Sequence, residues 1–223
     1  MKYYELVPYD QVHNNWLMFT EQREPPYVTL KPRFSDCVCP KCKMIDHDKA
    51  FAKGFDEPLK IRAKGDLLGT SEGFVCISEK AKQVVESFGL GGITLKEIPN
   101  AGWWVVSVTC RVNADRSAYT VTKPFCDQCG RPKETIGLIR CLNQIEAPDQ
   151  VGQFFSPTFD RGGSMNGDRD IFVTEDIVFL FKQQKLKGGI FERLLTPIEF
   201  AAIKAAGAEK NPLKWPKDSR VIL

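Results

Sequence analysis

The chain has 223 residues, of which 43% are hydrophobic and 26% are charged, an ordinary globular composition that argues against intrinsic disorder. Its 31 Lys and Arg against 28 Asp and Glu leave a net charge of +3, which is too even to indicate a polyanion-binding surface. No run of about 18 apolar residues is present and the N-terminus lacks the apolar core of a secretion signal, so we expect a cytoplasmic protein that does not span a membrane.

The first part of the chain leads to a close pair of cysteines. Residues 3–8 predict a short strand, and a group of prolines then carries the chain in extended form to Cys39 and Cys42. The polar segment 43–55 is predicted to form a short helix or a loop.

A strand–helix–strand segment follows. Residues 74–77 are apolar enough for a buried strand, and Ser78 is a suitable N-cap for a helix. Apolar side chains then recur at helical spacing until Gly89, where the helix is expected to end. A Gly-Gly turn leads into residues 93–98, which alternate in the manner of a half-buried strand.

Further strands and a second pair of cysteines come next. Aromatic and β-branched residues predict strands at 103–112 and 118–122. Cys126 and Cys129 form the second pair, and another strand is expected at 135–142.

The later chain repeats the pattern of the strand–helix–strand segment. Residues 171–175 match residues 75–79 in having an apolar triplet, a hydroxyl N-cap and a glutamate, and a helix with a Gly-Gly ending follows. A true duplication and two unrelated amphipathic helices with a common ending both fit this pattern. A short helix at 198–206 and an extended, poorly packed tail from Lys210 complete the chain.

The two cysteine pairs predict one metal site. Each is a C-x-x-C knuckle, in which a tight turn aims two thiolates at a metal ion about 2.3 Å away. In a long chain without a secretion signal, such pairs bind metal more often than they form disulfides. Together Cys39, Cys42, Cys126 and Cys129 would complete a closed tetrahedral site without an open catalytic position, so the expected cofactor is one structural Zn²⁺.

Alternatives to this site remain. The knuckles are separated by 83 residues, so the intervening segment must fold as a unit and return to the metal. Cys39 and Cys42 alone could form a thioredoxin-like redox pair, and Cys37 could replace one knuckle ligand. The signature of a zinc deaminase is absent, because neither His13 nor His47 begins an H-x-E motif.

The other candidates for chemistry carry less weight. Both histidines lie in polar segments, where a solvated side chain is expected. The Gly-rich loop 156–170 could hold a cation through its carboxylates, although such loops are usually just solvated. These carboxylates are Asp160, Asp168 and Asp170. Three cysteines in apolar stretches are expected to be small buried side chains: Cys76, Cys110 and Cys141. Since no catalytic constellation emerges, we do not expect an enzyme.

These elements predict an α+β protein with mainly antiparallel sheet, in which two similar strand–helix–strand units are joined by a split zinc ribbon. An N-terminal unit, 1–125, would contain the first knuckle and the first strand–helix–Gly-Gly element. A C-terminal unit, 126–223, would contain the second knuckle and the second element.

The knuckles and their surroundings resemble the bacterial double-CXXCG motif family. The second knuckle is followed by Gly130, a glutamate-capped helix runs into residues 90–99, and the stretch 172–195 is similar to the segment with which members of that family end. Lys43 departs from the pattern, because it stands where the first knuckle would have its glycine. The resemblance implies an immunity protein, which neutralises a cognate toxin by protein–protein binding.

We therefore expect a non-catalytic zinc-ribbon protein that binds a protein partner. Trp103 and Trp104 are neighbours in a predicted strand, so their indoles would point to opposite faces of the sheet. An indole that faces outward would make an effective binding hot spot, whereas in the alternative arrangement both indoles lie in the core or under a loop. The alternative function is nucleic-acid binding, in which basic residues around the knuckles contact phosphates. These residues are Lys41, Lys43, Arg131, Lys133 and Arg140.

Overall fold

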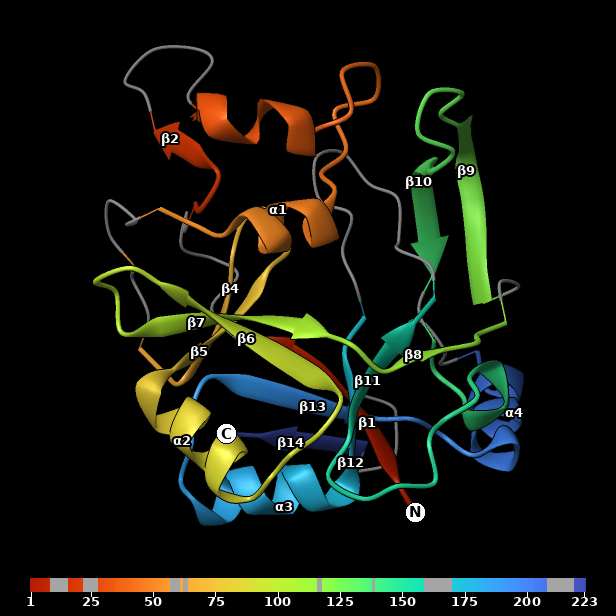
Figure 1. Ribbon diagram of the computed structural model, residues 1–223. Helices are drawn as coiled ribbons and strands as arrows, with labels where there is room; N and C mark the ends of the chain where they lie inside the picture. Colours follow the sequence, from red (N-terminus) through yellow and green to blue (C-terminus); the bar gives the residue numbers. More distant parts are fainter. Residues whose placement is uncertain are drawn as a thin grey trace.

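Figure 1 shows the computed structural model, which describes residues 1–8, 16–21, 28–56, 61, 64–115, 118–137, 139–158, 170–207 and 219–223. The strands are β1 (Tyr3–Pro8), β2 (Phe19–Glu21), β3 (Val28–Leu30), β4 (Leu67–Gly69), β5 (Val75–Ser78), β6 (Ile93–Ile98), β7 (Trp103–Val108), β8 (Arg111–Val112), β9 (Tyr119–Phe125), β10 (Pro132–Gly137), β11 (Phe154–Pro157), β12 (Phe172–Thr174), β13 (Gly189–Arg193) and β14 (Arg220–Ile222). The helices are α1 (His47–Lys53), α2 (Glu79–Ser87), α3 (Glu175–Gln183) and α4 (Pro197–Ala205), with 3₁₀ turns η1 (Pro32–Cys37) and η3 (Leu142–Gln144).

Two sheets make up most of the molecule. Six strands form one, in the order β14-β13-β1-β12-β11-β8, and four form the other, in the order β4-β5-β7-β6. Two small sheets, β2-β3 and β9-β10, contain two strands each. Among the described strands only β8 and β11 pair in parallel, so the expected mixed α+β fold with mainly antiparallel sheet is confirmed. None of the described helices is long and apolar enough to cross a membrane.

The two strand–helix–strand segments, β5-α2-β6 and β12-α3-β13, have the same topology. In each, the two strands flank a third strand that is antiparallel to both: β7 lies between β5 and β6, and β1 lies between β12 and β13. The registers correspond residue by residue, so that Ser78 is equivalent to Thr174. The helices also end alike, because Gly89 and Lys185 both take a left-handed conformation.

The two segments pack against each other reciprocally. A Cβ atom added at Gly92 would collide with the carbonyl oxygen of Phe154 in β11, and one added at Gly188 would collide with that of Leu67 in β4. Both glycines have φ angles, 79° and 89°, that side chains rarely tolerate. Each Gly-Gly turn therefore presses the end of one segment against the strand that pairs with the first strand of the other segment, β11 beside β12 and β4 beside β5.

The largest core lies between these two segments. Helix α2 contributes Val84 and Val85 to it, and α3 contributes Ile177 and Phe181. Strand β1, which the sequence interpretation grouped with the N-terminal unit, lies in the sheet between β12 and β13 of the C-terminal half. The two halves of the chain therefore share both a sheet and a core.

A second core lies on the other face of the four-stranded sheet, beside η1 and α1. Phe34, Ile45 and Phe55 pack there against Cys76 of β5 and Val105 of β7. This packing fixes the segment that carries the first knuckle to the four-stranded sheet. In Figure 1 that segment is orange and lies above the sheet.

The tryptophans of β7 point to opposite faces of the four-stranded sheet, as strand alternation predicts. Trp103 packs on the second core and Trp104 on the first, where Lys82 Nζ lies 5.0 Å from the centre of the Trp104 ring. Both indoles are half-buried. Neither is the exposed hot spot that the sequence suggested, because each face of the sheet has its own core.

The end of the chain is not the loosely packed tail that its prolines suggested. β14 pairs with β13, placing Val221 opposite Phe191, and Arg220 donates a hydrogen bond of 2.8 Å to Glu192. The preceding residues, 208–218, lie outside the described part of the chain.

Candidate metal centre

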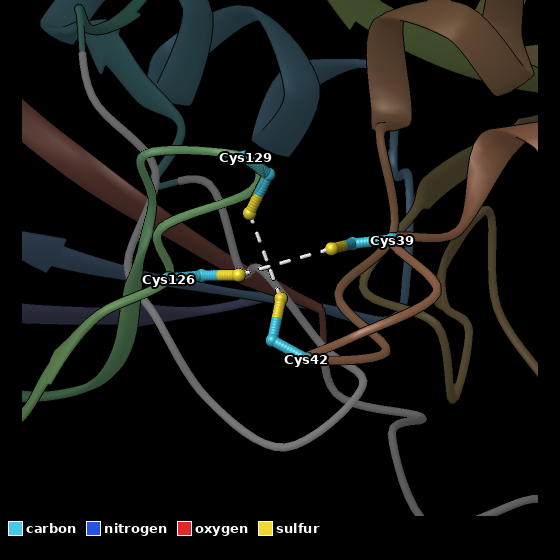
Figure 2. Close-up of side chains that lie close together, drawn as sticks. All are labelled: Cys39, Cys42, Cys126 and Cys129. Atoms are coloured by element: carbon cyan, nitrogen blue, oxygen red, sulfur yellow. Dashed lines mark hydrogen bonds between the residues drawn. The ribbon is translucent and has the colours of Figure 1, made fainter.

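The structure brings the four knuckle cysteines together. All four Sγ atoms lie within 4.8 Å of one another and point towards a common centre (Figure 2). The Sγ atoms of Cys39 and Cys126 are 3.9 Å apart, and those of Cys42 and Cys129 are 3.6 Å apart. Four thiolates at about 2.3 Å from a tetrahedral ion stand about 3.8 Å from one another, so this arrangement has the dimensions of a metal site.

The two knuckles are built from the same turn. In the first, the Lys43 amide donates to the Cys39 carbonyl (2.9 Å), and in the second the Gly130 amide donates to the Cys126 carbonyl (2.7 Å). Lys43 has a φ angle of 63° and Gly130 one of 68°, so both are left-handed. Lys43 therefore takes the same conformation as Gly130 at the equivalent position of the other knuckle, at a cost that a glycine would not have.

The turns also set the charge of the thiols. Backbone N–H groups, first that of Cys42, lower the pKa of Cys39 to about 6, and that of Cys129 similarly lowers the pKa of Cys126. Desolvation has the opposite effect on the second cysteine of each knuckle, raising the pKa of Cys42 to about 12 and that of Cys129 above its usual value. In each knuckle the first thiol therefore has the lower pKa of the two, and a divalent cation would favour ionisation of all four thiols.

Charged side chains connect the two knuckles around the cysteines. Lys41 Nζ of the first lies 2.6 Å from a carboxylate oxygen of Asp127 in the second. Arg131 of the second donates a 2.7 Å hydrogen bond to the Ile45 carbonyl and lies 3.2 Å from Asp46, whose side chain caps α1. These contacts join the two knuckles in addition to the cluster of cysteines.

The cluster of four cysteines lies where the β9-β10 hairpin meets the N-terminal part of the chain. This hairpin (green in Figure 1) belongs to neither large sheet, and the second knuckle forms its turn. The first knuckle follows η1, which is fixed to the second core by Phe34. The four cysteines are thus the place at which the hairpin is held to the rest of the molecule.

The remaining cysteines lie elsewhere. Cys37 is buried in the second core and is not one of the four clustered thiols, so a metal at this centre would not need it. Cys76 and Cys141 are buried as expected, whereas Cys110 is only half-buried.

His47 is not the solvated residue that its charged neighbours suggested. Its ring is buried, its Nε2 atom lies 2.7 Å from the Glu72 carbonyl oxygen, and it meets Phe74 edge to face. Asp170 is likewise buried. His13 and the other two aspartates of the proposed cation loop, Asp160 and Asp168, lie outside the described residues.

A buried carboxyl group at Glu72 was not predicted from the sequence. Its side chain is fully buried, and one oxygen accepts hydrogen bonds from the amides of Leu17 (2.6 Å) and Met18 (2.8 Å). The other oxygen has no partner among the described residues. Burial raises the pKa of Glu72 to about 7. The residues that enclose it are distant in sequence, which is why no local pattern marks it.

Comparison with known proteins adds no family to this description. No protein-family model matches the chain, and no curated protein matches it.

Proposed function

We propose that this chain is a non-catalytic binding protein whose frame is fixed by one structural Zn²⁺ at Cys39, Cys42, Cys126 and Cys129. The observation that carries the proposal is the closed set of four sulfurs with tetrahedral spacing. With four protein ligands the ion has no open position for a substrate, which is typical of structural rather than catalytic zinc. The ion would complete a split zinc ribbon between the two strand–helix–strand units.

The rest of the described structure supports binding rather than catalysis. Among the described residues, the four cysteines are the one group of three or more His, Cys, Asp or Glu side chains close enough to share a metal ion. His47, the histidine that lies in the described part, is buried against a backbone carbonyl group. The resemblance to the double-CXXCG family suggests the kind of binding: an immunity protein that neutralises a toxin by covering it.

Nucleic-acid binding has less support, because ion pairs occupy much of the basic surface around the knuckles. Lys41 pairs with Asp127 and Arg131 with Asp46. Arg140 lies 2.6 Å from Glu192 and is largely buried. A cation that is already paired must lose that partner before it contacts a phosphate.

Metal analysis of native protein, purified without added metal, tests the proposal. We expect one zinc per chain, lost in the Cys39→Ser variant and retained in the Cys110→Ser control, which removes a half-buried thiol outside the centre. A tetrathiolate site also suits iron, so the same analysis must measure iron. Metal-free native protein, or a Cys39→Ser variant with undiminished zinc, would contradict the zinc frame.

The binding role needs a separate test. If the chain is an immunity protein, its expression should protect cells from a toxin encoded beside it, and the two purified proteins should form a complex. Protection without complex formation would argue for another mechanism.

A further inference from the structure

The two equivalent segments differ at one edge. In the six-stranded sheet the outer edge of β13 is covered by β14. The equivalent strand of the four-stranded sheet is β6, which ends that sheet and pairs with β7 alone among the described strands. Within the described residues, the same edge is thus covered by a strand along β13 and not along β6, although Gly91, just before β6, forms a bridge with Gln153.

The backbone of β6 is oriented for pairing on its outer side. The Thr109 amide donates to the Gly92 carbonyl (2.7 Å), which sets the alternation of hydrogen bonds between β6 and β7. From this alternation, the backbone groups of Ile93, Leu95 and Glu97 face away from β7. Unpaired strand edges of this kind are templates for another strand.

The side chains of β6 indicate what kind of strand would fit. Leu95 is equivalent to Phe191, which lies opposite Val221 of β14, and Leu95 is only partly buried against the first core. An apolar residue opposite Leu95 would complete this packing, as Val221 does for Phe191.

The charge on β6 is opposite to that on β13. Lys96 occupies the position of Glu192, whose partner on β14 is Arg220. The Lys96 ammonium donates to the Ala52 carbonyl (2.8 Å), and no carboxylate pairs with it in the described part of the chain. An acidic residue is therefore the complement of Lys96, just as Arg220 is of Glu192.

We propose that the outer edge of β6 binds an extended segment of a partner protein by antiparallel strand addition, with an apolar residue opposite Leu95 and an acidic residue opposite Lys96. This inference rests on the proposed protein-binding function and identifies the surface that would perform it. Main-chain hydrogen bonds would supply affinity, and the alternating side chains specificity.

Amide hydrogen exchange with a short capped peptide of alternating valine and glutamate tests this proposal. In the free, metal-loaded protein, the amides of Ile93, Leu95 and Glu97 should exchange faster than those of Thr94 and Lys96. Saturating peptide should slow the three outward amides by about tenfold or more, because each acquires a hydrogen bond. Replacing glutamate by lysine in the peptide should weaken binding by about two- to fivefold, the usual range for an exposed ion pair.

A matched pair of variants removes one outward donor. Glu97→Pro deletes an N–H group that β7 does not use, whereas the control Glu97→Thr keeps it; the Glu97 side chain is exposed in both cases. We expect the proline variant to lose peptide binding and the threonine variant to keep it. Should the proline variant fail to fold, N-methylation of the peptide amides that face β6 removes the same hydrogen bonds from the other side and should abolish binding.

Three results would overturn the proposal. The first is slow exchange of the outward amides in the free monomer, and the second is unchanged exchange of these amides when peptide is added. The third is exchange of these amides that slows as the protein concentration rises without peptide, which would assign the edge to a second copy of the chain. The zinc frame is measured separately by metal content. If the protein contains zinc but its β6 amides do not respond to peptide, the β6 binding surface alone is refuted. If peptide protects the β6 amides of a protein that contains no zinc, the structural role of zinc alone is refuted.

Discussion

The buried carboxyl group of Glu72 makes the stability of this protein depend on pH in an unusual direction. Burial raises the pKa of this group from 4.5 to about 7. A raised carboxyl pKa means that the folded protein holds the proton more tightly than the unfolded chain does. The contribution of Glu72 to stability is therefore most favourable below about pH 4.5, falls as the pH rises to about 7, and is constant above that.

The size of the effect follows from the same values. Each pKa unit corresponds to about 1.4 kcal/mol, so ionisation of Glu72 costs the folded state about 3 kcal/mol at alkaline pH. Between about pH 5.5 and about pH 8 the expected loss of unfolding free energy is about 2 kcal/mol. The thiol of Cys76 lies close enough to feel this charge, and the Glu72 carboxylate contributes to raising the pKa of that thiol.

The Glu72→Gln variant isolates this contribution. The amide oxygen of glutamine can accept the same hydrogen bonds from Leu17 and Met18, but the side chain cannot ionise. Urea unfolding of both proteins across this pH range should show the difference between them changing by about 2 kcal/mol in favour of the variant as the pH rises. If a metal is bound, its loss at low pH would affect both proteins equally and cancel in the difference. Parallel pH profiles would show that Glu72 is not held in this desolvated state.

Other substitutions test other parts of the structure. Chelation of the metal, or the Cys39→Ser substitution, should release the β9-β10 hairpin. Amide hydrogen exchange should then become faster in the hairpin and change little in β5 and β7. Unaltered exchange in the hairpin would contradict its attachment through the four cysteines. Lys43→Gly should raise the free energy of unfolding by about 1 kcal/mol, because it removes a left-handed side chain. Gly130→Ala should lower it by about the same amount through backbone strain alone, since no atom lies within 4 Å of the added Cβ. Equal effects of the same sign would refute the equivalence of the two knuckles. Arg140→Met should lower the free energy of unfolding, measured in urea, by about 3 kcal/mol, because it leaves the largely buried Glu192 carboxylate without one of its two cationic partners. A change near zero would show that stability does not depend on this ion pair.

Features that depend on a few neighbouring residues could be predicted from the sequence. The C-x-x-C spacing predicted the knuckles, Ser78 predicted the start of α2, and the alternation of residues 93–98 predicted β6 with its observed bounds. The repeated hydroxyl–glutamate pattern predicted the start of α3 after Thr174, although the Thr174 hydroxyl accepts from the Gln153 amide and, unlike that of Ser78, makes no capping hydrogen bond. Each of these signals comes from backbone geometry within one turn or one strand, where local sterics and hydrogen bonds dominate.

Features that depend on contacts between distant segments required the tertiary structure. β4, β11 and β14 are three or four residues long and carry no clear alternation; they are strands because other strands pair with them. The sequence predicted β1 with its observed bounds, but not its place between β12 and β13, which joins the two ends of the chain.

Burial was decided in the same way. The polar residues next to His47 in the sequence suggested that its side chain is solvated, yet the ring, at the start of α1, is buried against Phe74. The sequence could supply the ligands of a metal site and the elements of two similar units. Only the tertiary structure showed that β6 ends its sheet and which charges are buried, because these depend on the packing of residues far apart in the chain.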